Sequence, residues 1–134
     1  YIALLKGLLF MTSTADLEAL IESTALSSNQ ESIKGLVDRQ VPDGMVVGRK
    51  FSSACYITDS WPSILYLALK YHENPKSALL VNANLGGDNV HRGAILGTIL
   101  GLANPPAVVP LFSELTESQA LSNEIEVFCG LSNA

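Results

Sequence analysis

The residues best suited to chemistry gather in one short stretch of the chain, between Asn84 and Arg92. This stretch contains two adjacent glycines, one carboxylate and one imidazole, at Gly86, Gly87, Asp88 and His91. Adjacent glycines allow a backbone with positive φ that can approach a ligand closely. A carboxylate binds hard cations such as Mg²⁺ or Mn²⁺, and an imidazole serves as a base, a metal ligand or a hydrogen-bond partner. We therefore expect any chemistry or ligand binding here.

The carboxylate and the glycines also have ordinary structural interpretations. Asp88 lies at or just before a helix start, where an N-cap carboxylate accepts hydrogen bonds from backbone N–H groups. Spacing alone favours this cap over a cation site. Gly86-Gly87 is equally a usual helix stop, and it fits neither the P-loop nor the dinucleotide-binding pattern. Both interpretations stay open at the level of the residues.

The remaining polar residues of the stretch are ambiguous in the same way. A lone histidine such as His91 is more often structural than catalytic, and no serine or cysteine is obviously paired with it. Asn84 and Asn89 can orient a ligand or cap helix ends. Arg92 can contact a phosphate or pair with a carboxylate such as Asp59.

Two helices must position this stretch. Asn74-Pro75 is a cap followed by proline, which opens a helix over Lys76–Asn84. The next helix spans Asn89–Leu102 and is apolar almost throughout after Arg92, which predicts burial on every side. Glycines recur in it at a spacing of four and cost roughly 1 kcal/mol each relative to alanine. Close approach of a neighbouring helix would offset this cost at Gly93, Gly97 and Gly101.

Helices are also expected upstream. An apolar run at Tyr1–Met11 predicts a buried helix, and Thr12 to Thr14 can cap the next one, over Ala15–Leu26. Ser28 with Glu31 fits a capping box that opens a helix over Gln30–Arg39. Val41–Lys50 is the one long irregular segment, and a functional loop and a plain surface loop are equally compatible with it. Phe51–Thr58 is expected to begin the following helix, with Asp59 as a cap and Pro62 in the first turn.

The C-terminal part of the sequence predicts shorter elements. Asn104-Pro105-Pro106 stops the long helix, and Pro110 starts a short turn over Leu111–Leu115. Thr116 with Gln119 is a capping box for a last helix that ends near Cys129, before Gly130. No run shows convincing period-two alternation and no repeat is present. The predicted fold class is therefore all-α, an orthogonal helical bundle.

The composition indicates a surface that is partly covered. The chain has 134 residues, of which 48% are hydrophobic and only 16% are charged. The usual charged fraction is about a quarter. The sequence also begins at Tyr1 inside an apolar run. We therefore expect residues 1–134 to be the C-terminal part of a larger all-α domain whose N-terminal half, or another partner, covers an apolar face.

Charge and cysteine content exclude several classes. The net charge of −5 without a cluster of basic residues argues against nucleic-acid binding. Tyr1–Met11 is too short to span a membrane, so no membrane association is expected. Cys55 and Cys129 form neither a metal-binding spacing nor a disulfide framework. A reducing intracellular location, the cytoplasm, is the expectation.

The polar stretch is similar to a known motif. Asn84-Leu-Gly-Gly-Asp-Asn-Val-His-Arg-Gly, followed by Ala-Ile-Leu-Gly-Thr-Ile-Leu-Gly, resembles the C-terminal motif of the ADP-ribosylglycohydrolase family. This family includes the dinitrogenase-reductase-activating glycohydrolases and the J-class crystallins. Ala54–Tyr71 resembles the helix that precedes the motif in the family, and Gly44–Gly48 resembles its glycine-containing loop. The resemblance covers about Pro42–Cys129.

The resemblance implies a fold and an activity. It implies an all-α domain of about twice this length, with Mg²⁺ or Mn²⁺ ions beside an ADP-ribose cleft and hydrolysis at the ribose anomeric carbon. It assigns Asp88 to the metal. Backbone donors to phosphate would come from the Gly44–Gly48 loop and from the paired glycines. The ligand-binding residues that it implies are Asn84, Gly86, Gly87, Asn89, His91 and Gly48.

Two departures from the family pattern limit this implication. The family motif runs Gly-Gly-Asp-x-Asp-Thr/Ser, but Val90 stands in place of the second carboxylate and His91 in place of the hydroxyl. Because charge count sets the affinity for hard cations, the metal site should be lost or reduced to one ion. The family's Thr-Asp-Asp ligands belong to the N-terminal half. We therefore predict a protein that hydrolyses or binds an ADP-ribosyl group, or else a non-catalytic, crystallin-like structural relative.

Overall fold

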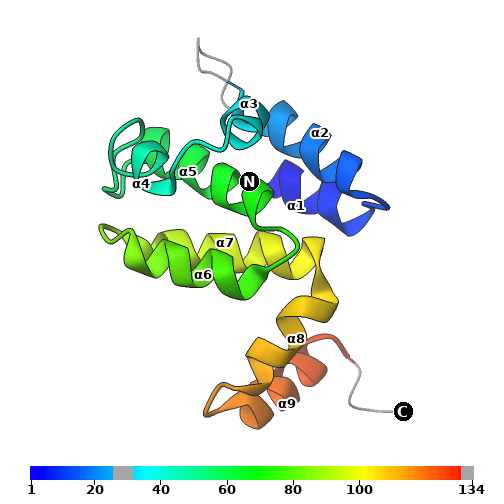
Figure 1. Cartoon of the computed structure of the whole chain (residues 1–134). Coiled ribbons are helices and arrows are strands. Elements are labelled where there is room, and N and C mark those ends of the chain that lie inside the picture. Colours follow the sequence, from blue (N-terminus) through cyan, green and yellow to red (C-terminus); the bar gives the residue numbers. More distant parts are fainter. Residues whose placement is uncertain (26–31, 131–134) are drawn as a thin grey trace.

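The computed structural model describes residues 1–25 and 32–130 of the chain. Within these ranges the regular structure is α-helical, apart from one isolated bridge between Val47 and Phe51. The predicted all-α class is confirmed. The helices are α1 Ile2–Leu9, α2 Thr14–Thr24, α3 Ile33–Asp38, α4 Asp43–Val46, α5 Ile57–Lys70, α6 Pro75–Asn84, α7 Asn89–Ala103, α8 Pro105–Ser113 and α9 Ser118–Phe128 (Figure 1).

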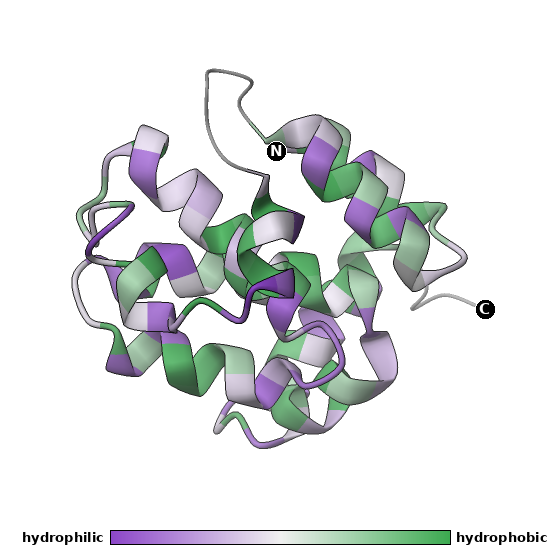
Figure 2. Ribbon diagram, turned by 45° about the horizontal axis from the view of Figure 1, so that its top comes forward, coloured by the Kyte–Doolittle hydropathy of each residue, from purple (hydrophilic) through white to green (hydrophobic). Residues whose placement is uncertain are grey.

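Helix α5 is the centre of the fold. Every residue from Trp61 to Leu69 is buried, so this helix has neighbours on all sides. Helices α2, α3, α6 and α7 all pack against it. Consecutive helices α6 and α7 lie side by side as a hairpin beneath α5 in Figure 1. Figure 2 shows hydrophobic segments in the middle of the molecule and also on its outer helices. The turn between α6 and α7 carries the polar stretch of the sequence.

The last two helices extend from this body. Helix α8 packs against α6 and α7, and α9 packs against α8 (Figure 1). Neither helix contains a buried residue. Large apolar side chains such as Ile125 and Phe128 are therefore exposed on α9, Phe128 by 92%.

The N-terminal helices follow the predicted order with shifted ends. Helix α1 is only half buried, because Leu4 and Leu8 face the core while Phe10 beyond its end is exposed. The prediction of a buried helix is wrong in that respect. Helix α2 is capped as predicted, since Ser13 accepts a hydrogen bond from the backbone of Asp16 and the Asp16 carboxylate accepts one in return.

Helix α3 begins after a serine cap. It starts at Ile33, because the Ser32 side chain accepts a hydrogen bond from the backbone N–H of Gly35 and caps the helix there. The predicted start at Gln30 lies outside the described residues. The proposed capping box of Ser28 with Glu31 lies outside the described residues.

The segment before α5 differs most from the prediction. The supposed irregular segment Val41–Lys50 contains α4, and Val46 and Val47 in it are buried. The helix predicted to begin over Phe51–Thr58 begins only near the end of that segment, at Ile57, so Pro62 lies inside α5 and not in its first turn. The Asp59 carboxylate explains the error, because it accepts a hydrogen bond from the backbone N–H of Ser52 and anchors the preceding loop.

Proline and cap signals near the C-terminus also need correction. Asn104 does end α7, but Pro105 at once opens α8 and Pro110 lies inside it. Helix α9 starts after Glu117, and the predicted box of Thr116 with Gln119 is absent from this described segment because the Gln119 side chain donates to Asn123. Gly130 ends the helix with a φ of +69°, as expected of a C-terminal glycine.

Candidate functional site

The turn between α6 and α7 is shaped by its two glycines. Gly86 and Gly87 have φ values of +66° and +63°, so the prediction of positive φ is confirmed. A Cβ on Gly87 would lie 2.2 Å from the carbonyl oxygen of Ser53. The backbone N–H of Asp88 donates to that same oxygen over 2.9 Å. The close approach permitted by glycine therefore joins the turn to the loop before α5.

A buried arginine, Arg92, binds the same turn through hydrogen bonds. The exposed fractions of Asn82 and Arg92 are 3% and 2%. Arg92 Nε donates to Asn82 Oδ1 over 2.5 Å, and Nη2 donates to the carbonyl oxygens of Asn82 and Gly86. Burial lowers the pKa of Arg92, and the nearby charge of Asp88 opposes this shift. Of the two roles left open for Arg92, pairing with a carboxylate such as Asp59 is therefore not the one adopted, because the guanidinium binds Asn82 and Gly86.

Close packing of the glycines in α7 is confirmed at one position. A Cβ on Gly93 would lie 2.9 Å from Nδ2 of Asn82, so glycine lets α6 and α7 approach there. Gly97 and Gly101 face only ordinary contacts at 4.0 and 3.9 Å. Helix α7 is also not buried on every side, because residues such as Val90 and Thr98 are exposed.

Asp88 occupies the N-cap position of α7, but its side chain does not cap the helix. Its Oδ1 instead lies 2.6 Å from Nδ1 of His91. The side chain of Asp88 is 23% exposed and that of His91 is 82% exposed. The interpretation favoured by spacing, a backbone-capping carboxylate, is therefore wrong, and the carboxylate is bound to an imidazole.

This pair lines a pocket of about 330 Å³ between α5 and the first turns of α7. The pocket has apolar walls and one polar side. Its lining residues are Cys55, Ile57, Ser60, Ile64, Asp88, His91, Arg92 and Ile95. Sequence reasoning missed the α5 wall, although Ile57, Ser60 and Ile64 recur at helical spacing and share one face. The predicted cap at Asp59 separated Ile57 from Ser60 and Ile64, and this hid the shared face.

The other predicted ligand residues do not line this pocket. Asn89 donates from Nδ2 to the carbonyl oxygen of Ala83, and so binds the end of α6. Asn84 is exposed at the last position of α6. Gly48, with a φ of +113°, lies in the loop after α4. Of the predicted set, the structure brings only Asp88 and His91 into the pocket.

The donor set does not by itself fit a divalent-metal site. Among the residues that the structure describes, no group of three or more His, Cys, Asp or Glu side chains could hold a metal ion. Val90, at the position of the second carboxylate, is 74% exposed. The pocket offers one carboxylate, which is already bonded to the imidazole of His91.

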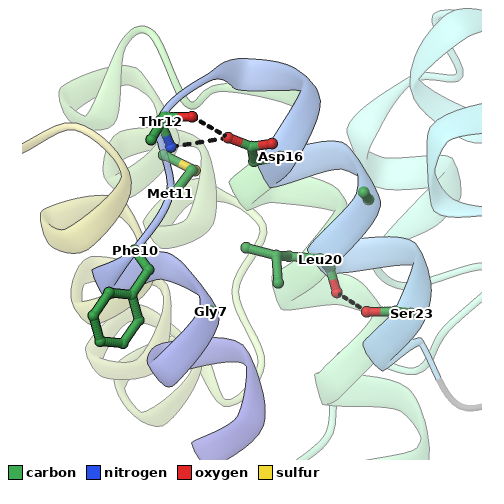
Figure 3. Close-up of a pocket in the computed structure, with 8 residues that line it drawn as sticks. Gly7, Phe10, Met11, Thr12, Asp16, Leu20 and Ser23 are labelled. Carbon is green, nitrogen blue, oxygen red and sulfur yellow. Dashed lines mark hydrogen bonds between the residues drawn. The ribbon is translucent and has the colours of Figure 1, made fainter.

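A larger pocket of about 530 Å³ lies between α1 and α2 and has no comparable polar pair (Figure 3). Its polar side chains form hydrogen bonds with residues close to them in sequence. Asp16 accepts from the backbone and hydroxyl of Thr12, and Ser23 donates to the carbonyl oxygen of Leu20. Hydrogen bonds from Thr12 and Ser13 lower the pKa of the Asp16 carboxyl. The smaller pocket is therefore the better candidate site.

Comparison with known families decides the relationship. The family model described as ADP-ribosylglycohydrolase matches residues 2–127. The chain belongs to the ADP-ribosylglycohydrolase family. The match begins well before Pro42, so the family domain here includes α1 to α3 as well as the segment whose motif resembles the family. No curated protein and no solved structure matches the chain. In the described parts of this ADP-ribosylglycohydrolase-family chain, no helix is long and apolar enough to cross a membrane.

Proposed function

We propose that the pocket between α5 and α7 binds an ADP-ribosyl group, and that in an active protein this group is hydrolysed there. One observation carries the proposal: Asp88 and His91 form a hydrogen-bonded pair on a pocket, at the motif that is most specific for the family. Membership of the ADP-ribosylglycohydrolase family supports the substrate class.

The pocket has the composition of a small-molecule site. Such sites are mostly apolar, with a few polar groups that fix orientation, and they begin at about 300 Å³. Ile57, Ile64 and Ile95 would pack against the faces of a sugar or a base. His91 would face ribose hydroxyls. Given its volume of about 330 Å³, we expect the pocket to hold one part of ADP-ribose.

Assistance by Mg²⁺ or Mn²⁺ is implied by the family and stays a prediction. Asp88 is the carboxylate that this chain would offer to such an ion. Further ligands, the Thr-Asp-Asp motif that the resemblance implies, would have to come from an N-terminal half of the domain. The described residues do not complete such a site by themselves.

Calorimetric titration with ADP-ribose tests the proposal, in Mg²⁺, in Mn²⁺ and in EDTA. Ile95→Trp should fill the pocket and weaken binding by about tenfold or more. Thr98→Trp is the matched control, since Thr98 lies on the exposed face of the same helix and should bind like the parent chain. Absence of binding under all three conditions would sink the proposal.

A second candidate function is a non-catalytic relative, either an ADP-ribose-binding module or a crystallin-like structural protein. Val90 favours it, because an apolar side chain stands where the family motif has its second carboxylate. Release of ADP-ribose from ADP-ribosylated peptides, modified on arginine or on serine, separates the two functions. Binding without release identifies a binding module, and release identifies an enzyme.

A further inference from the structure

We propose that Asp88 and His91 act as a carboxylate–imidazole pair that recognises a ribose hydroxyl without a divalent cation. Asp88 is the positioning residue of the pair and His91 is the group that contacts the ligand. The inference rests on the proposed function, because it assigns roles within the same pocket. It also departs from the family pattern, in which this aspartate binds metal.

The hydrogen bond between the two side chains sets the form of the imidazole. Oδ1 of an ionised carboxylate can only accept, so Nδ1 of His91 carries the hydrogen across the 2.6 Å contact. In a neutral ring the other nitrogen, Nε2, is then an acceptor. The ring lines the pocket and is 82% exposed, so this acceptor is open to a ligand. A sugar hydroxyl is a donor of matching chemistry.

The carboxylate of Asp88 has a second electrostatic partner in Arg92. The guanidinium is buried, and its hydrogen bonds go to neutral oxygens of Asn82 and Gly86. A buried cation is costly unless an anion compensates it. Asp88 supplies that negative charge and opposes the loss of the arginine proton that burial favours. The carboxylate therefore already balances a positive group within the protein.

A divalent cation at Asp88 would disturb both interactions. It would have to displace the Nδ1 hydrogen of His91 from Oδ1, and its charge would be repelled by the buried Arg92. Val90 would not help to bind it, because valine has no donor atom. The two departures from the family motif, Val90 and His91, thus both disfavour binding of a divalent cation at Asp88. They leave Asp88 bonded to an imidazole and without a second carboxylate beside it.

The test compares the parent chain with Asp88→Asn and His91→Gln, using ADP-ribose as the probe. The parent should bind ADP-ribose equally in EDTA and in Mn²⁺. His91→Gln should weaken binding about tenfold, the effect of one hydrogen bond of moderate strength. Asp88→Asn should do the same, because an amide can stabilise the wrong imidazole tautomer. Asp38→Asn, an exposed acid on α3, is the control and should change nothing.

Ring ¹⁵N chemical shifts give a readout that a merely structural role would not move. They should report hydrogen on Nδ1 of His91 in the parent chain and a changed tautomer in Asp88→Asn. Equimolar Mn²⁺ should leave the ring signals sharp. Selective broadening of these signals, or binding of ADP-ribose only with a cation, would overturn the inference and leave the proposed function standing. Absence of ADP-ribose binding with and without a cation would instead overturn the proposed function, and this inference with it.

Discussion

At the level of single residues, His91 changes what Asp88 can do. The aspartate sits at the N-cap, where its side chain would ordinarily accept from the backbone of the next turn. His91 is the third residue of the helix and offers a ring N–H to the same oxygen at 2.6 Å. The side-chain partner displaces the backbone partner. Sequence spacing allows both arrangements, which explains why it predicted the position of Asp88 but not its bond.

Restoring the family motif should therefore require two substitutions. Val90→Asp alone adds a carboxylate, but a cation would still have to break the bond between Asp88 and His91. Val90→Asp with His91→Thr frees Asp88, and we expect Mn²⁺ to bind the double variant about ten times more tightly than the single one. Isothermal titration with Mn²⁺ measures the difference, with Val90→Asn/His91→Thr as the control for charge. Equal affinity of the single and double variants would contradict the role given to His91.

At the level of elements, the site depends on the junction of the α6–α7 turn with the loop before α5. Ser53 and Gly87 meet so closely that only glycine fits. This junction also shows the limit of sequence reasoning. The paired glycines predicted a turn with positive φ, because that property is local. Their partner at Ser53 is distant in sequence and was not predicted. Asp59 was interpreted as a helix cap, but its carboxylate accepts a hydrogen bond from the loop before α5.

The two glycines of the turn should respond differently to alanine. Both have left-handed φ, which costs an alanine roughly 1–2 kcal/mol. At Gly86 nothing lies within 4 Å of a new Cβ, so Gly86→Ala should show only this cost. Gly87→Ala also forces the turn away from Ser53, and we expect a further loss of roughly 1–3 kcal/mol. Urea denaturation of the two variants provides the comparison, and equal stability would show that the Ser53 contact is not constraining.

At the level of the whole molecule, a polar network ties the α4 segment to the C-terminal end of the central helix. Asp43 accepts from Lys70 over 2.6 Å, from Tyr71 over 2.7 Å and from Tyr66 over 3.0 Å. Burial raises the pKa of the Asp43 carboxyl, but the hydrogen bonds from these three side chains outweigh burial, and the pKa lies below its ordinary value. Burial, together with Asp43, raises the pKa of Tyr66.

This network should make stability depend on pH. A lowered carboxyl pKa stabilises the folded state above the unfolded pKa of about 3.9, and this contribution is lost as the pH falls through the folded pKa. At about pH 7, Asp43→Asn should reduce the free energy of unfolding by about 1–3 kcal/mol. This difference from the parent chain should become smaller in acid. Urea denaturation across this range gives the profile. Asp38→Asn, whose pair with Lys34 is exposed, should stay within about 1 kcal/mol of the parent chain throughout.

The apolar residues outside the core agree with the low charge content of the chain. Ile2 and Phe10 at α1 and Phe128 at the end of α9 are largely exposed. Composition predicted an apolar face outside the core of this chain, because it counts residues without needing their positions. Covering of this surface by an N-terminal half of the domain stays a prediction.

The polar contacts within the α6–α7 hairpin are close in sequence, which bears on the order of folding. Asn82 and Arg92 are ten residues apart, Asn82 and Asn89 seven, and Asp88 and His91 three. Contacts of such short range close small loops and lose little chain entropy. The α6–α7 hairpin can thus assemble early, with the Asp88–His91 pair already in place. The other wall of the pocket belongs to α5, whose lining residues are more distant in sequence from α7. The site would therefore be completed only when the central helix packs against the hairpin.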